Sequence, residues 1–352
     1  MQPPVTQFAY QREPLWLDRW HESSGDGTQL EAAWERSRQT LMRMAELLDA
    51  EITDDRILCI AASGSLGRME QVATSDGDLL VVMRGDGQCG ADAIALRELV
   101  ERVWETLGPL QLPLPDPRGI FALATTEQEL LDESTLGQMD ESPRSFGHRI
   151  QLLLDAQPVW GLKDFNDLAH RSLVRYASGD VWPSVPSWDY LRNDLIRYYR
   201  CLANDAIWRR RDQPSAWRHF QLKLLHSRRL IYAGLMTLLS ESTCSQRDPV
   251  DWLVWALRLT PLERLAIVPD DSGAWITVAA TYDRFLRSMH DEQFRAALAE
   301  TSDDSGAAPD LMANAAFEEL IENSRELQQG VAELWQQQLG RWDDRTLLGL
   351  ML

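Results

Sequence analysis

The sequence predicts an α+β fold, in which an α/β core with a small mixed sheet is followed by a mainly α-helical C-terminal domain. Two short apolar runs with strand composition, residues 57–61 and 79–83, flank a turn of small residues. Segments with helical periodicity surround these runs. From about residue 145 the pattern is almost entirely helical. We therefore predict two domains, residues 1–145 and residues 146–352.

Length, composition and charge narrow the class of protein. The chain has 352 residues, 44% of them hydrophobic and 25% charged, which is typical of a folded globular protein. Its formal net charge of −19 opposes indiscriminate binding to nucleic acids and anionic membranes, so we expect neither a DNA nor a membrane partner. The four cysteines are scattered, without a Cys-x-x-Cys pair, and no apolar run reaches membrane-spanning length. These features predict a cytoplasmic protein.

The order of predicted elements is typical of an α/β core. Residues 28–51 show an apolar stripe at helical spacing, and we expect this helix to pack on the sheet just before the first strand. A second amphipathic helix is predicted over residues 91–107. A loop with four prolines then leads to a third apolar run, residues 119–124, interpreted as a short strand. Two long helices are predicted near residues 187–211 and 215–240.

The most informative stretch lies between the first two strands. It reads Ala-Ser-Gly-Ser-Leu-Gly-Arg-Met-Glu over residues 62–70, and Ser-Asp-Gly-Asp follows at residues 75–78, where the second apolar run begins. If the second strand begins at Asp76, then Asp76 and Asp78 are expected to point the same way, because side chains alternate along a strand. Two carboxylates held so close repel each other unless a divalent cation such as Mg²⁺ lies between them. The backbone of Gly64 and the hydroxyl of Ser65 are suited to binding phosphate.

At these residues the sequence resembles the DNA polymerase beta nucleotidyltransferase superfamily. That superfamily carries a Gly-Ser turn followed by an acid-x-acid pair at the start of a strand. The string Gly64-Ser65-x-Gly67-Arg68-x-Glu70 is most similar to the branch that contains bacterial uridylyltransferases of nitrogen-signalling proteins and uncharacterised relatives. The close match covers about twenty residues, and weaker similarity extends to roughly residue 235.

The resemblance implies a role for each matching residue. Asp76 and Asp78 would be the catalytic residues and would hold Mg²⁺ or Mn²⁺. Gly64, Ser65 and Arg68 would bind the phosphates of the nucleotide. Glu70 would orient Arg68 or assist the metal, or would be an ordinary residue of a helix cap. In this part of the chain the predicted site consists of Gly64, Ser65, Arg68, Glu70, Asp76 and Asp78.

The third strand departs from the superfamily pattern. Active members commonly place a third carboxylate there, whereas residues 120–124 contain no acid. Asp116 and Glu127 flank this run and are the two candidates for a substitute from a loop. The identity of the general base is left open.

A basic segment interrupts the acidic chain. Residues 192–229 contain ten arginines and lysines against three acids. Asn193, Arg197, Arg200 and Asn204 recur at intervals that place them on one helix face. We predict that Arg197 and Arg200 bind the nucleotide, so that the helical domain completes the nucleotide or acceptor site. The alternative interpretation is an arginine-rich helix that pairs with acidic parts of the chain.

Together these features predict a metal-dependent nucleotidyltransferase that moves a nucleoside monophosphate from an NTP, such as ATP, to an acceptor and releases pyrophosphate. The acidic chain favours a hydroxyl of a protein or small molecule as the acceptor. A tRNA end docking on the basic segment is a further possibility. Two alternatives stay open: a toxin or antiphage enzyme that modifies tRNA or proteins, and a non-catalytic nucleotide sensor that lacks the third carboxylate.

Overall fold

The α+β class is confirmed by the computed structural model, which pairs a small mixed sheet with many helices. The structure describes residues 6–24, 28–72, 75–85, 93–117, 119–132, 138, 141–178, 188–245, 247–299 and 311–342. The predicted loop at residues 182–186 lies outside these ranges.

The sheet has four strands in the order β3-β2-β1-β4. Strand β1 (Ile57–Ser63) pairs antiparallel with β2 (Asp78–Met83) and with β4 (Gln157–Trp160), and β3 (Thr125–Thr126) runs parallel to β2. All seven residues of β1 are buried, which explains why this strand reads as a continuous apolar run without alternation. In the register of the pair, Ser63 at the end of β1 lies opposite Asp78 at the start of β2. The two motif segments therefore meet at one end of the paired strands β1 and β2.

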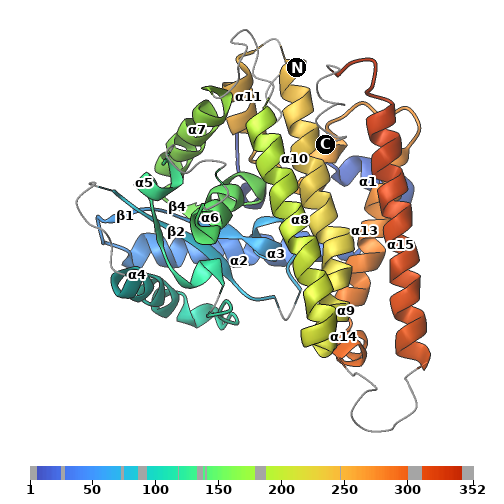
Figure 1. Ribbon diagram of the computed structural model, residues 1–352, viewed down its shortest axis with the longest axis horizontal. Coiled ribbons are helices and arrows are strands. Elements are labelled where there is room, and N and C mark those ends of the chain that lie inside the picture. Colours follow the sequence, from blue (N-terminus) through green and yellow to red (C-terminus); the bar gives the residue numbers. More distant parts are fainter. Residues whose placement is uncertain are drawn as a thin grey trace.

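Helices cover both faces of this sheet, as Figure 1 shows with α2 behind the strands and α6 in front. The expected first helix is α2 (Gln29–Glu51), whose N-cap Thr28 accepts a hydrogen bond from the Glu31 backbone. The second expected helix is α4 (Ala93–Thr106). Helices α6 (Pro143–Leu154) and α7 (Leu162–Ser178) follow the core.

The predicted third strand is wrong. Residues 120–122 form a short 3₁₀ helix, η3 (Ile120–Ala122), and the strand that joins the sheet is the later β3. The carbonyl of Ile120 accepts a hydrogen bond from Nε2 of His148 on α6 (2.7 Å). A Cβ on Gly147 would lie 3.1 Å from the Ile120 side chain, so this segment packs closely against α6. Phe121 and Ala124 of this run are buried, and the segment contacts β2 as well as α6. A strand pattern does not distinguish such burial from sheet pairing.

Long helices make up the C-terminal half, and Figure 1 shows several of them side by side on one flank of the sheet. Their bounds are α8 (Asp189–Asp212), α9 (Pro214–Lys223), the π-helical segment η4 (Leu224–Arg228), α10 (Arg229–Thr243), α11 (Pro249–Ala256), α12 (Pro261–Ala266), α13 (Ala274–His290), α14 (Glu292–Ala299) and α15 (Leu311–Gln336). The shorter elements are η1 (Ala9–Gln11), α1 (Leu17–Ser24), η2 (Gly108–Leu110) and α5 (Glu127–Leu130). In the described ranges, every helix is too short or too polar to cross a bilayer.

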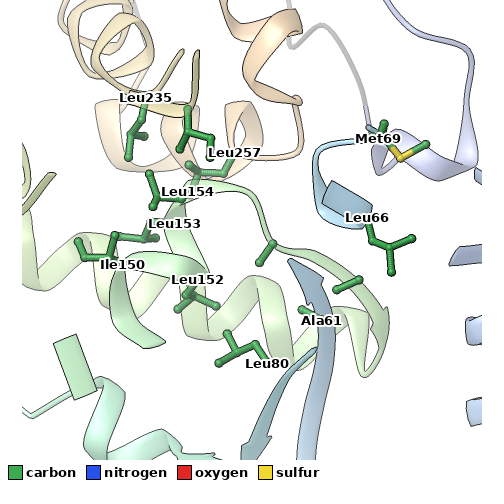
Figure 2. Close-up of a cluster of buried hydrophobic side chains, with 14 of the residues drawn as sticks. Ala61, Leu66, Met69, Leu80, Ile150, Leu152, Leu153, Leu154, Leu235 and Leu257 are labelled. Atoms are coloured by element: carbon green, nitrogen blue, oxygen red, sulfur yellow. The ribbon is translucent and has the colours of Figure 1, made fainter. Parts of the chain in front are cut away.

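One hydrophobic core joins the two halves. Figure 2 shows Leu80 of the sheet, Leu152 of α6 and Leu235 of the helical half within the same cluster of buried side chains. The N-terminal segment also contacts the C-terminal half, because the Leu30 backbone donates to Asp283 (2.9 Å) and Trp20 packs edge-on against Trp275. Strand β4 lies beyond residue 146, so the sheet itself includes residues from both predicted domains. The boundary between residues 145 and 146 stays a prediction.

Candidate active site

The turn after β1 is built for close approach to the second strand. Helix α3 (Gly64–Gly67) is one turn long, and Gly64 has a φ of +65°, which favours glycine. A Cβ on Gly64 would lie 2.4 Å from Oδ2 of Asp78, a distance that real Cβ atoms essentially never show. Glycine therefore lets the backbone of the turn touch the carboxylate of the second motif.

The turn ends in a tight reversal that brings Arg68 and Glu70 together. Met69 has a φ of +62°, unusual for a residue with a side chain. The Glu70 N–H donates to the Ser65 carbonyl (2.8 Å), and the Met69 N–H donates to the Leu66 carbonyl (3.0 Å), which is the Schellman pattern. The reversal places Nε of Arg68 2.8 Å from Oε2 of Glu70. This contact agrees with the interpretation in which Glu70 orients Arg68.

A carboxylate that the sequence reasoning missed holds the other side of Arg68. Nη1 of Arg68 donates to Oδ2 of Asp155 (2.7 Å), and both side chains are buried. Burial alone would lower the pKa of Arg68, but the negative charges of Glu70 and Asp155 outweigh it and raise that pKa. The sequence signal for Asp155 is weak: one acid directly after the apolar run of residues 152–154.

Asp76 and Asp78 line one cavity, as their spacing predicts. Burial, with a further contribution from the nearby charge of Asp76, raises the pKa of Asp78 to about 6. Strand β2 begins at Asp78, so Asp76 lies in the segment just before the strand. In the described parts of the chain, no group of three or more histidine, cysteine or acidic side chains could hold a metal ion. The pair of carboxylates does fit a cation that takes its other ligands from water and substrate phosphates.

The same cavity has a second wall from the C-terminal half. The motif wall and the helical wall are separated by more than 130 positions in sequence but face the same space. The polar lining residues of the motif wall are Gly64, Ser65, Arg68, Glu70, Ser75, Asp76 and Asp78, and those of the helical wall are His219, Lys223, Ser227, Arg228 and Arg295. Phe285, Leu286 and Met289 of α13 complete the lining together with Val72.

A π-helical segment presents two of the helical residues. Ser227 and Arg228 lie on η4, between α9 and α10. Such segments change the direction of side chains within a helix and are frequent at functional sites. His226 anchors η4, because its Nδ1–H donates to the Leu222 carbonyl (2.9 Å) and its ring stacks on Phe285 at 4.4 Å. Burial lowers the pKa of His226 to about 4, so this anchor is uncharged at neutral pH.

Within the described ranges, the cations of the helical wall form no ion pair with a carboxylate. Within the residues that the structure describes, neither Lys223 nor Arg228 forms an ion pair. Arg295 donates to the backbone carbonyls of Met289 (2.7 Å) and His290 (2.9 Å). Lys223 is exposed where it lines the cavity, but many protein atoms lie around it. The resulting desolvation, together with the positive charge of Arg228, lowers the pKa of Lys223.

The two arginines predicted from the sequence lie elsewhere on α8. The guanidinium of Arg197 pairs with Glu141 and lies 3.8 Å from the centre of the Phe146 ring. Arg200 has an exposed side chain. The residues that line the cavity include neither of them. The helical half reaches the cavity through Lys223, Arg228 and Arg295 instead.

The two candidates for a third carboxylate also lie outside this lining. Glu127 pairs with Arg171 of α7. The backbone carbonyl of Asp116 accepts a hydrogen bond from the Gly119 N–H (2.8 Å). Strand β3, which runs beside β2, consists of Thr125 and Thr126 and therefore carries no acid.

The short mixed sheet brings the glycine turn against the carboxylate of Asp78, and one known family model matches this part of the chain. Residues 21–124 match the family model described as "Putative nucleotidyltransferase DUF294". The matched segment contains α2, the turn, Arg68 and both motif acids. The match supports a nucleotidyltransferase family for this part of the chain and a general nucleotidyl-transfer function. No curated protein matches the chain.

Proposed function

We propose that this protein transfers a nucleoside monophosphate from a metal-bound NTP to a hydroxyl group of a protein or small-molecule acceptor and releases pyrophosphate. The single observation that carries this proposal is the cavity in which Lys223, Arg228 and Arg295 face Asp76 and Asp78, while none of the three cations forms an ion pair within the described residues. A cavity of this kind is suited to a ligand that is itself strongly anionic and that arrives with a divalent cation.

The distribution of charge supports a triphosphate. Arg68 is balanced by Glu70 and Asp155, so it adds little free positive charge to the cavity. Lys223, Arg228 and Arg295 line the same cavity without carboxylate partners among the described residues. We therefore assign the direct phosphate contacts to these three cations, together with the Gly64 backbone and the Ser65 hydroxyl.

Asp76 and Asp78 are the residues that would hold Mg²⁺ or Mn²⁺. An ion held by these two carboxylates would supply positive charge beside the triphosphate during transfer. The close approach of Gly64 to Asp78 places the turn beside the carboxylates, so phosphates bound at the turn would lie next to this pair. The cations of the helical wall would hold the leaving pyrophosphate.

In the transfer step a bond forms between the acceptor oxygen and the α-phosphorus. The bond from the α-phosphorus to the bridging oxygen of the β-phosphate breaks, and that oxygen keeps the electron pair as pyrophosphate leaves. The hydroxyl proton passes to a base. The net charge of −19 favours a protein or small molecule as acceptor, while a tRNA end, as in a toxin or antiphage enzyme, is the alternative outcome of the test.

A non-catalytic nucleotide sensor is the second candidate. The specific observation in its favour is that β3, the strand beside β2, consists of Thr125 and Thr126 and does not supply the third carboxylate that the superfamily resemblance implies. A sensor would bind Mg²⁺-NTP in the same cavity but release no pyrophosphate.

The experiment incubates the purified protein with each α-³²P-labelled NTP, Mg²⁺ or Mn²⁺, and a cell extract. Pyrophosphate release is measured, and the label is followed into protein, RNA and small molecules. We expect label on protein or small molecules, lost in Asp76→Asn. Label on RNA would favour the tRNA alternative, and tight NTP binding without pyrophosphate would favour the sensor. A protein that binds no NTP at all would contradict both candidates.

A further inference from the structure

The turn Gly64–Gly67 is held at both ends by one carboxylate. Ser63 is the N-cap residue of this turn and Arg68 is its C-cap residue. Oγ of Ser63 donates to Oδ1 of Asp155 (2.6 Å), and Nη1 of Arg68 donates to Oδ2 of the same carboxylate (2.7 Å). Asp155 itself is 1% exposed. We propose that Asp155 is a positioning residue, which fixes the turn so that it can bind the triphosphate.

The backbone of Asp155 reinforces this contact. A Cβ on Gly67 would lie 2.2 Å from the backbone carbonyl oxygen of Asp155 and 2.7 Å from that of Ala62. The last residue of the turn is therefore enclosed by the segment that carries the carboxylate. Asp155 therefore fixes both ends and one side of the turn. On another side of the turn, Asp78 lies against Gly64.

We call the two hydrogen bonds of Asp155, to Ser63 and to Arg68, the clamp. Its contacts extend into the helical half. The Gln151 Oε1 lies 2.9 Å from the Ser63 hydroxyl, and the Gln151 amide donates to the hydroxyl of Tyr198 on α8 (2.6 Å). Asp155 is the C-cap residue of α6, the helix that lies between the sheet and the C-terminal helices (Figure 2). A buried network thus connects α8 through α6 to the turn.

This geometry gives the motif arginine a different role from the one that its position in the motif suggests. Two of its nitrogens, Nε and Nη1, are committed to Glu70 and Asp155. A buried guanidinium with two carboxylate partners is held in one orientation, because breaking either contact would leave a charge buried without its partner. Arg68 therefore couples Asp155 to the reversal at residues 68–70. On the motif wall the phosphate contacts then come from Gly64 and Ser65 and not from Arg68.

The proposal rests on the proposed function where it concerns the triphosphate, and the test separates the two. The first variant is Asp155→Asn. Its matched control is Glu263→Gln, which breaks another buried ion pair, that with Arg12, away from the cavity lining. A milder variant, Ser63→Ala, removes one contact of the clamp and leaves no buried charge unpaired.

Three measurements are made on each folded variant. Hydrogen exchange of the amides in residues 63–70 reports the turn without any ligand. Calorimetry gives the Kd of the Mg²⁺-NTP that binds the wild type best, and electron paramagnetic resonance gives the Kd of Mn²⁺ alone. We expect Asp155→Asn to speed exchange in this segment at least tenfold and to weaken NTP binding at least tenfold. The Kd of Mn²⁺ should change less than threefold, because Asp76 and Asp78 are intact.

The outcomes are distinct. Wild-type exchange and NTP affinity in a folded Asp155→Asn protein would overturn the proposal, as would equal effects in Glu263→Gln. If Asp155→Asn does not fold, Ser63→Ala decides, with at least a threefold loss of NTP affinity expected and an unchanged affinity contradicting the clamp. If the wild type binds no NTP but Asp155→Asn still loosens the turn, the proposed function fails while the positioning role stands.

Discussion

Gly64 and Asp78 are in direct contact across the candidate active site, where a Cβ on Gly64 would lie 2.4 Å from Oδ2 of Asp78. The phosphate-binding turn and the carboxylate pair are thus not two neighbouring features but one packed unit. Any side chain at residue 64 must displace either the turn or the carboxylate.

The first prediction tests this contact with Gly64→Ala. The variant combines a steric clash with a φ of +65°, so we expect loss of Mg²⁺-NTP binding in calorimetry together with lower stability in urea unfolding. Gly273→Ala is the matched control, because Gly273 has a φ of +76° but no atom within 4 Å of its would-be Cβ. The control should lose about 1–2 kcal/mol through backbone strain and keep normal NTP affinity. Equal NTP affinity in both variants would contradict the direct contact.

The second prediction concerns Asp78→Asn. The pKa of this carboxyl rises from 3.8 to about 6 on folding, because burial and the charge of Asp76 oppose its ionisation. Between about pH 4 and pH 6, Asp78 is therefore protonated in the folded state but ionised in the unfolded state. The free energy of unfolding of the wild type consequently falls as the pH rises through this range. Above it, ionised Asp78 costs about 1–3 kcal/mol.

Asp78→Asn removes this cost and should stabilise the apoprotein at pH 7.5 but not at pH 4, as measured by urea unfolding. The same variant should abolish nucleotidyl transfer, since one of the two proposed metal ligands is lost. A variant that transfers at the wild-type rate would remove Asp78 from the metal site. A stability gain that is equal at both pH values would show that charge repulsion is not its cause.

The parts of the fold that the sequence predicts are those with local signals. Strand β1 is an apolar run, α2 has a periodic stripe with a Thr28 cap, and Gly64 with the acids at 76 and 78 follows a recognisable spacing. In each case the pattern and the structure concern residues that are close in sequence. The failed strand at residues 119–124 has the same kind of signal, but the segment forms a 3₁₀ helix that packs against β2 and against α6, which lies more than twenty residues later.

The parts of the site that sequence reasoning missed depend on contacts between distant residues. Asp155 meets Arg68 across 87 positions, and Lys223 and Arg228 reach a cavity whose opposite wall ends at residue 78. The basic segment did contain both of these cations, but a helical periodicity argument selected Arg197 and Arg200. Which face of a helix meets a cavity is decided by tertiary packing, and Arg197 is turned toward Glu141 and Phe146.

The third prediction concerns His226, which anchors η4. Burial lowers its pKa from 6.5 to about 4, so the unfolded chain binds a proton below pH 6.5 that the folded protein excludes. Stability contributed by neutral His226 is present above pH 6.5 and is lost as the pH falls toward 4, by up to about 1.4 kcal/mol per pH unit.

His226→Gln should be less stable than the wild type at pH 7.5, because the stack on Phe285 and the fit of the ring are lost. Its stability should fall less steeply between pH 6.5 and pH 5, as measured by urea unfolding at several pH values. His290→Gln changes an exposed histidine and should keep the wild-type slope. An unchanged slope in His226→Gln would mean that this histidine is not held neutral.

The last prediction decides which cations bind the triphosphate. Lys223→Met and Arg228→Met each remove one unpaired charge from the cavity, and loss of a charge-assisted contact costs about 1.5–3 kcal/mol, or roughly tenfold to hundredfold in Kd. Arg200→Met removes an exposed charge from α8, outside the lining, and should leave the Kd for Mg²⁺-NTP within twofold of the wild type.

Arg197→Met provides a second comparison, since it breaks the pair with Glu141 and should lower the free energy of unfolding without a matching loss of NTP affinity. Calorimetry at two salt concentrations adds a further test, because losing a phosphate contact should reduce the salt dependence of binding, whereas losing a remote charge changes it little. The opposite result would be weaker Mg²⁺-NTP binding in the variants at residues 197 and 200 and unchanged binding in those at residues 223 and 228. In that case the face of α8 that the sequence pattern selects binds the nucleotide, and the cations of the cavity bind another ligand.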